Sequence, residues 1–203
     1  MTRKRILLIG ATGMLGTIVS RELGRQADVV EASHRNAEHR VDITSSASIR
    51  ALFEKVGEVD AIISTAGRVH YGLVTKTTAE QFMSGLRNKL LGQIDIALIG
   101  QAFLRDGGSI TLTSGIVSEH FIRMGANMAS VNRGVEGFVA AAAPELARGQ
   151  RINVVSPAMI EESVGTYGPF FAGFEPVAGA RVAQAYVRSV EGIESGRTYR
   201  VWH

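Results

Sequence analysis

The sequence predicts an α/β fold in which helices cover both faces of a parallel sheet. Short runs rich in β-branched residues alternate with amphipathic segments along all 203 residues, which is the pattern of β-α-β units. Runs such as Ile62–Thr65 and Ile152–Ser156 are largely apolar on both faces, as strands buried on both sides are. A glycine-rich turn follows the first apolar run directly. Together these observations predict a doubly wound sheet.

The individual elements follow from the alternation of the two periodicities. Predicted strands are Ile6–Ile9, Asp28–Ala32, Arg40–Ile43, Ala61–Thr65, Ser109–Thr113, Arg151–Val155 and Thr198–Val201. Predicted helices are Leu15–Leu23, Ala47–Val56, Ala79–Leu104, Met124–Ala147 and Val177–Val190. Thr77 and Glu80 have the spacing of a capping box that opens the helix at Ala79. No repeat, low-complexity tract or flexible linker divides the chain, so residues 1–203 are predicted to form one domain.

The turn after the first strand is predicted to bind a dinucleotide. Gly10, Gly13 and Gly16 are spaced three apart and follow the apolar run Ile6–Ile9. In this setting the first glycine allows the tight turn, the second lets the backbone approach a pyrophosphate, and the third lets the helix pack on the sheet. The N-terminus of the following helix offers unpaired N–H groups to the phosphates. The alternative is an ordinary glycine-rich turn between a strand and a helix.

The residues after the second strand bear on which dinucleotide is bound. Ser33, His34 and Arg35 stand where an NAD-binding protein carries an acid for the ribose hydroxyls. A guanidinium can pair with a 2′-phosphate through two hydrogen bonds, and a serine can donate another. These residues favour NADP(H) over NAD(H). The competing interpretation is that Glu31 ends the strand and binds the ribose.

Composition narrows the other possibilities. The net charge is only +3, from 22 basic and 19 acidic residues, and the basic residues are scattered, so no nucleic-acid partner is predicted. The chain has no cysteine, which excludes disulfides and thiolate metal sites, and no metal site is predicted. No apolar run approaches the roughly 20 residues that span a bilayer. Thr2–Arg5 is interpreted as a charged lead-in to the first strand, and the expected location is the cytoplasm.

Five segments in this order resemble a short-chain dehydrogenase/reductase over nearly the whole chain. They are GATGMLG, Asp42-Ile43, Ser64-Thr65-Ala66-Gly67, GSITLTSG and INVVSPAMIEES. The resemblance implies that Asp42 and Ile43 contact adenine, that Ser64–Gly67 lies beside the adenosine ribose, and that Ile160 after Pro157 meets the nicotinamide carboxamide. Met14 occupies a position that is commonly glycine in the family. The predicted cofactor-binding set is Gly10, Thr12, Gly13, Met14, Leu15, Gly16, Ser33, His34, Arg35, Asp42, Ile43, Ser64, Thr65, Ala66, Gly67, Pro157 and Ile160.

The segment that carries catalysis departs from the family. The resemblance implies a Tyr that exchanges a proton with the substrate and, four residues later, a Lys that lowers the Tyr pKa. Alignment on INVVSP and on Gly137-Phe138 instead places Met128 at the Tyr position and Asn132 at the Lys position. Methionine has no titratable proton and asparagine carries no charge. The usual proton-transfer residues are therefore predicted to be absent.

Three residues are candidates for the missing chemistry. Ser114 lies near the substrate-polarising serine of the family and could donate a hydrogen bond to the substrate oxygen. Lys89 lies about where the family has a helix asparagine, and it could direct a cation toward the vacant lysine position; the alternative is a surface lysine. His120 could replace the tyrosine as proton donor, and the alternative is a solvated loop histidine. His70 and Tyr71 are expected at the same rim.

The segment 163–177 is predicted to be a substrate lid. Its stretch Tyr167–Phe174 carries four aromatic residues, which favours a hydrophobic or aromatic small-molecule substrate or a dimer contact. Trp202, directly after the last predicted strand, is expected to anchor a homodimer or homotetramer. The predicted function is an NADP(H)-dependent oxidoreductase acting on a carbonyl or alcohol. The alternative is a non-catalytic NADP(H)-binding sensor or scaffold.

Overall fold

A seven-stranded sheet forms the centre of the molecule, in the order β3-β2-β1-β4-β5-β6-β7, with every adjacent pair parallel. The computed structural model describes residues 3–203. The strands are β1 Arg5–Ile9, β2 Asp28–Ser33, β3 His39–Arg40, β4 Val59–Ser64, β5 Leu104–Thr113, β6 Arg151–Pro157 and β7 Thr198–Val201. This is the predicted α/β fold, a Rossmann-type doubly wound sheet.

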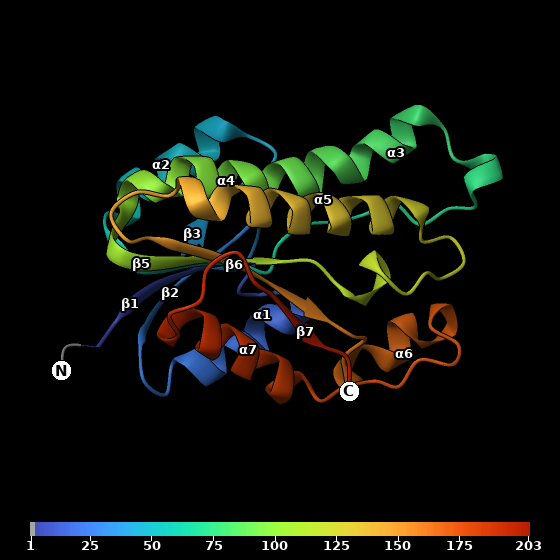
Figure 1. Ribbon diagram of the computed structural model, residues 1–203. Coiled ribbons are helices and arrows are strands. Elements are labelled where there is room, and N and C mark those ends of the chain that lie inside the picture. The colour runs from blue at the N-terminus through green and yellow to red at the C-terminus, as the bar shows by residue number, and fades with distance from the viewer. Residues whose placement is uncertain (1–2) are drawn as a thin grey trace.

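Helices cover both faces of the sheet (Figure 1). The α-helices are α1 Met14–Leu23, α2 Ser46–Val56, α3 Ala79–Gly85, α4 Gly92–Gly100, α5 Ala126–Ala142, α6 Val164–Tyr167 and α7 Gly179–Glu191. A π-helical segment, η2, spans Leu86–Leu91, and 3-10 turns are η1 Val74–Lys76, η3 Gln101–Phe103, η4 Ile116–Ser118, η5 Ala143–Glu145, η6 Glu161–Ser163 and η7 Gly168–Phe170. In Figure 1, α2, α3, α4 and α5 lie on one face, and α1 and α7 lie on the other.

Each face of the sheet has its own hydrophobic core. One core packs α1 and α7 against the sheet and includes Val19 and Tyr186, both fully buried. The other packs α2, α4 and α5 and includes Phe53 and Ile96, also fully buried. Because consecutive side chains of a strand point to opposite faces, Leu7 and Leu8 of β1 belong to different cores. The two-sided apolar strands of the sequence are explained by this double burial.

Four predicted features differ in their details. The helix expected over residues 79–104 is instead the succession α3, η2, α4 and η3, and β5 begins at Leu104. The capping box uses Thr78 and Gln81, because the Thr77 hydroxyl donates to the carbonyl oxygen of Leu73. The third strand covers only His39–Arg40, since the chain turns where Asp42 accepts hydrogen bonds from Thr44. The fifth helix begins at Ala126 rather than at Met124.

Glycines bring the π-helical segment η2 close to its neighbours. A Cβ on Gly85 would overlap the side chain of Asn127 in α5. A Cβ on Gly92 would lie 2.8 Å from the carbonyl oxygen of Ile43. The wider turn between these glycines alters the direction in which its side chains project, and Lys89 belongs to it. Such π-helical turns are frequent at functional sites.

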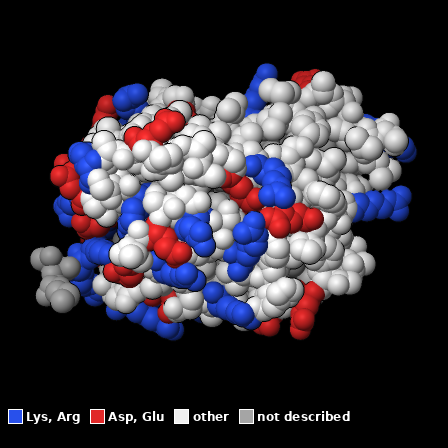
Figure 2. Space-filling model, in the orientation of Figure 1, with Lys and Arg blue, Asp and Glu red and all other residues white. Residues whose placement is uncertain are grey.

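Charges of both signs are mixed on the face of the molecule shown in Figure 2. Over α7 and β7, for example, Glu194 forms ion pairs with Arg188 and Arg197. Glu119 similarly accepts hydrogen bonds from Arg200. The visible face therefore carries no large area of one sign, in keeping with the scattered basic residues of the sequence.

Candidate active site

The glycine turn between β1 and α1 has the close contacts that only glycine permits. Gly10 adopts φ +94°, and a Cβ there would lie 2.8 Å from both the backbone nitrogen of Ala66 and Oγ1 of Thr65. A Cβ on Gly16 would overlap the carbonyl oxygen of Gly10. Gly13 is the N-cap residue of α1 and has no side chain to occupy the space before the helix. The turn therefore leaves the N-terminus of α1 open to a phosphate.

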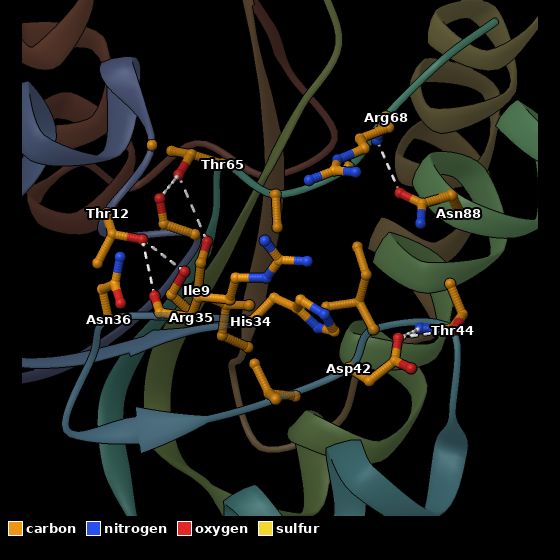
Figure 3. Close-up of a pocket in the computed structure, with 17 residues that line it drawn as sticks. Ile9, Thr12, His34, Arg35, Asn36, Asp42, Thr44, Thr65, Arg68 and Asn88 are labelled. Carbon is orange, nitrogen blue, oxygen red and sulfur yellow. Dashed lines mark hydrogen bonds between the residues drawn. The ribbon is translucent and has the colours of Figure 1, made fainter.

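A first cavity of about 570 Å³ lies at the carboxyl ends of β1, β2 and β4, where a doubly wound sheet binds its ligand. Gly10, Thr12 and Gly13 line one side of it, and Ser33, His34 and Arg35 line another. Figure 3 shows Thr12 beside the loop that carries Arg35 and Asn36. The Thr12 and Ser33 hydroxyls are 2.6 Å apart, and Thr12 also donates to the carbonyl oxygen of Arg35. The loop after β2 is thereby fixed to the glycine turn.

Glu31 does not line this cavity. Its carboxylate instead accepts a hydrogen bond from the Ser20 hydroxyl of α1. The competing interpretation of the sequence, in which Glu31 binds the ribose, therefore lacks geometric support. The exposed His34 and Arg35 are the titratable side chains that β2 and its following loop present to the cavity.

Most of the other predicted adenosine contacts also line the first cavity. Asp42, Ile43, Thr65, Ala66 and Gly67 are among its lining residues. The hydrogen bond from the Thr44 hydroxyl, followed by that from the Thr44 backbone, lowers the pKa of Asp42. Ser64 is fully buried and lines neither cavity, because the strand directs it into the sheet. Gly16 likewise lines neither cavity. Its lack of a side chain lets α1 pack closely on the glycine turn.

A second cavity of about 510 Å³ adjoins the first, and Gly67 and Arg68 belong to both. Four residues of the predicted cofactor-binding set, Met14, Leu15, Pro157 and Ile160, line the second cavity. So do Met128 and Asn132 of α5, together with Lys89 and Ser114. The structure thus brings two of the three catalytic candidates to one cavity beside the expected cofactor site.

Lys89 lies in the second cavity with its ammonium directed at α5 and β5. Its Nζ donates hydrogen bonds to Oδ1 of Asn132 at 2.9 Å and to the carbonyl oxygen of Ser114 at 3.1 Å. Burial lowers the pKa of Lys89 to about 8, although the negative charge of Glu136 acts in the opposite direction. Gly67 packs against the Lys89 side chain, where a Cβ would lie 2.6 Å from its Cγ. The Lys89 side chain is therefore fixed by hydrogen bonds and is not a freely solvated surface lysine.

Ser114 is at the second cavity, but its hydroxyl is engaged elsewhere. Oγ of Ser114 donates to Oε1 of Glu136 at 2.7 Å, and both residues are buried. The predicted donation from this hydroxyl to a substrate oxygen would require it to leave the Glu136 carboxylate, to which it donates in the structure. The carbonyl oxygen of Ser114 accepts a hydrogen bond from Lys89.

Glu136 is a site residue that the motif comparison missed. It lies on the same face of α5 as Met128 and Asn132, at successive spacings of four residues, and all three are buried. An acidic residue in line with Met128 and Asn132 was the signal available in the sequence. Its second carboxylate oxygen lies 3.4 Å from the guanidinium of Arg133.

His120 lies outside both cavities. Its ring packs edge-on against Trp202 and Phe174, with centroid distances of 5.1 and 6.5 Å. The loop after β5 turns through η4 and carries His120 toward the C-terminal strand instead of toward Asn132. His70 also lines neither cavity, whereas Tyr71 lines the second. The structure therefore does not support His120 as a proton donor.

Aromatic side chains from the predicted lid close the outer end of the second cavity. Tyr167 and Phe171 line it together with Tyr71. Tyr71 stacks on Tyr167 with a centroid distance of 6.3 Å and lies 5.5 Å from Phe170. Burial, and secondarily the charge of Tyr167, raises the pKa of Tyr71 to about 12. Tyr71 is therefore a neutral, apolar wall at physiological pH.

Within the described residues 3–203, no group of three or more His, Cys, Asp or Glu side chains could hold a metal ion. Within the same range, no helix has the length and apolar character required to cross a membrane.

The fold and the two adjoining cavities define a dinucleotide-binding protein of the doubly wound class. A family model described as enoyl-(acyl carrier protein) reductase matches residues 10–194. The chain belongs to this family, and so to the short-chain dehydrogenase/reductases, which are NAD(P)(H)-dependent oxidoreductases.

Individual relatives agree with this assignment. Carbonyl reductase family member 4 of Xenopus laevis is 31% identical over 128 residues, which are 59% of this chain and 53% of that protein. The alignment thus spans about half of the relative's length. The 3-oxoacyl-[acyl-carrier-protein] reductase of Mus musculus is 26% identical over 162 residues, 75% of this chain and 68% of its own.

Solved structures of high similarity extend over almost the whole chain. The protein lin1944 from Listeria innocua has 44% identity and a TM-score of 0.97, covering 98% of this chain and 100% of that one. A small-chain dehydrogenase in complex with NADPH has 25% identity and a TM-score of 0.87, covering 98% and 97%.

Proposed function

We propose that this protein is an NADP(H)-dependent oxidoreductase that interconverts a carbonyl and an alcohol, with Lys89 in place of the usual proton-donating tyrosine. The observation that carries the proposal is the Lys89 ammonium at the second cavity, held by Asn132 and by the Ser114 carbonyl. These acceptors occupy two of its three N–H bonds, so one remains for a substrate oxygen. A pKa near 8 suits proton transfer at physiological pH.

The cofactor is proposed to be NADP(H), which supplies or accepts the hydride. Ser33 and Arg35 line the first cavity and match a 2′-phosphate, and Glu31 is bonded to α1. An NADPH complex of a 25% identical dehydrogenase is consistent with this choice.

In the reductive direction, hydride reaches the carbonyl carbon while the carbonyl oxygen accepts the proton of the Lys89 ammonium. The product is an alcohol, Lys89 is left as a neutral amine, and water returns the proton. The reverse reaction uses the neutral amine as the base. Met128 offers no proton, so it serves as an apolar wall beside the reacting carbon. Asn132 and Ser114 position Lys89.

The substrate is proposed to be a small hydrophobic or aromatic molecule. Tyr71, Tyr167 and Phe171 line the outer part of the second cavity, and Met128 and Val117 lie deeper. Self-association as a homodimer or homotetramer stays a prediction. Leu91 and Leu98 support it, because both are about half exposed and lie two turns apart on the η2–α4 segment.

A non-catalytic NADP(H) sensor is the second candidate function. Two observations favour it: Met128 stands at the tyrosine position, and the Ser114 hydroxyl is bonded to Glu136. Under this alternative, Lys89 would only organise the cofactor cleft.

Binding followed by turnover separates the two candidates. NADPH fluorescence should change on binding, with a lower Kd than for NADH. A panel of apolar and aromatic aldehydes and ketones is then tested for consumption of NADPH. The catalytic proposal expects turnover that Lys89→Met lowers by at least 100-fold while NADPH still binds. Lys55→Met, at the exposed end of α2, is the matched control. Turnover unaffected by Lys89→Met would remove Lys89 as the acid, and tight binding without any turnover would favour the sensor.

A further inference from the structure

Arg68 lies where the two cavities meet. The residues shared by both cavities are Gly67 and Arg68, which follow the carboxyl end of β4. On the side formed by the glycine turn, Gly13 lines the first cavity and the next residue, Met14, lines the second. These two residues are the N-cap and the first residue of α1. The junction is therefore bounded by the N-terminus of a ten-residue helix and by Arg68.

The backbone of Arg68 is fixed, whereas its charge is unpaired. The Arg68 N–H donates to Oδ1 of Asn88 at 2.7 Å, and Gly67, with φ +127°, packs directly on Lys89. Within residues 3–203 the guanidinium of Arg68 makes no hydrogen bond or ion pair, and the residue is exposed. Figure 3 shows its side chain extending into the pocket, away from the Asn88 contact. An unpaired guanidinium on a fixed stretch of backbone at a cavity is available to bind an anion.

We propose that Arg68 binds the pyrophosphate of the dinucleotide from the wall opposite α1. The inference rests on the proposed function, in which adenosine occupies the first cavity and nicotinamide the second. The pyrophosphate joins these halves, so it lies at the junction of the cavities. There it receives the N–H groups and positive dipole end of α1 on one side. Arg68 supplies two parallel hydrogen bonds and a full charge on the other.

This assignment differs from two other roles for the same cation. Arg35 lines only the first cavity and is the residue expected at the 2′-phosphate. If Arg68 also bound the 2′-phosphate, its removal would weaken NADPH and spare NADH. If it bound an anionic substrate, its removal would spare both nucleotides. The pyrophosphate is common to NADPH and NADH, which makes the roles separable.

Four ligands and four variants test the assignment by equilibrium binding. Arg68→Met should raise the Kd of NADPH, NADH and ADP-ribose by the same factor, roughly tenfold. It should leave the Kd of 2′-AMP, which has no pyrophosphate, unchanged. Arg35→Met should raise the Kd of NADPH and 2′-AMP only. Arg50→Met, at an exposed position of α2, is the control for loss of one positive charge.

The outcomes are distinct from those that test the proposed function. An Arg68→Met protein that binds all four ligands as the wild type does would overturn the Arg68 assignment alone. A loss confined to NADPH and 2′-AMP would overturn it in favour of the 2′-phosphate. A wild-type protein that bound neither NADPH nor NADH would overturn both the proposed function and the Arg68 assignment. Arg68→Lys should restore only part of the affinity, because an ammonium cannot form the two parallel bonds.

Discussion

The ammonium of Lys89, in the π-helical segment η2, donates a 2.9 Å hydrogen bond to Oδ1 of Asn132 in α5. The family resemblance leads one to expect the opposite arrangement, with the asparagine near residue 89 and the lysine at residue 132. In this structure the amide is instead on α5 and the cation is on η2. A positive charge is still present at the second cavity, but η2 supplies it and not α5.

The pH dependence of reduction should report the Lys89 ammonium. Burial lowers the pKa of Lys89 from 10.5 to about 8. Only the protonated form can donate, so kcat/KM for reduction should fall as the pH rises through about 8, and oxidation should rise over the same range. The Glu136 carboxylate raises the Lys89 pKa, so Glu136→Gln should move both midpoints to lower pH.

Glu136→Asp is the control for this shift, because it keeps the charge on α5. Its midpoints should stay closer to those of the wild type than those of Glu136→Gln. Rate–pH profiles of the three proteins make the comparison. Identical midpoints in all three would show that the titrating group is not Lys89 beside Glu136.

Cofactor preference should depend on Ser33. Its hydroxyl lies 2.6 Å from the Thr12 hydroxyl at the edge of the first cavity. Ser33→Asp would put a carboxylate beside the proposed 2′-phosphate, and repulsion should raise the Kd of NADPH by about 100-fold with little loss for NADH. Glu31→Gln should leave the ratio unchanged, because Glu31 is bonded to Ser20. A larger effect at Glu31 than at Ser33 would reverse the assignment.

The aromatic lid should affect substrate binding more than cofactor binding. Tyr167 stacks on Tyr71 and lines the second cavity. Tyr167→Ala should raise KM for aromatic substrates by roughly tenfold, as expected for the loss of one aromatic stacking contact. The Kd of NADPH should change little. Phe121→Ala, which removes a 74% exposed ring, is the control and should leave both constants unchanged.

Stability should depend sharply on which glycine is replaced. A Cβ on Gly16 overlaps the carbonyl oxygen of Gly10, whereas one on Gly137 of α5 meets no atom within 4 Å. Gly16→Ala should lower the free energy of unfolding by about 3 kcal/mol, since backbone must move. Gly137→Ala should raise it by about 0.5–1 kcal/mol through helix propensity. Urea unfolding curves measure both. Equal stabilities would contradict the close approach of α1 to the turn.

The order of strands and helices was predictable because it depends on local patterns. The apolar run of β1, the glycine spacing before α1 and the two-sided strands β4 and β6 each restrict their own backbone. The ends of helices and strands were less predictable where a side-chain hydrogen bond decides which residue begins or ends the element. The Thr77 hydroxyl bonds back to Leu73, so the cap passes to Thr78. The Asp42–Thr44 turn likewise ends β3 early.

The sequence by itself determined the α/β fold, the glycine turn and most of the residues that line the first cavity, because those features follow from neighbours along the chain. Only the tertiary structure decided how the polar side chains at the second cavity are paired. Packing of η2 on α5 brings Lys89 to Asn132, and packing of α5 on β5 turns the Ser114 hydroxyl toward Glu136. The loop after β5 likewise carries His120 to Trp202. Each contact joins distant parts of the chain, and the direction of a side chain there depends on which partner can satisfy its charge or hydrogen bond.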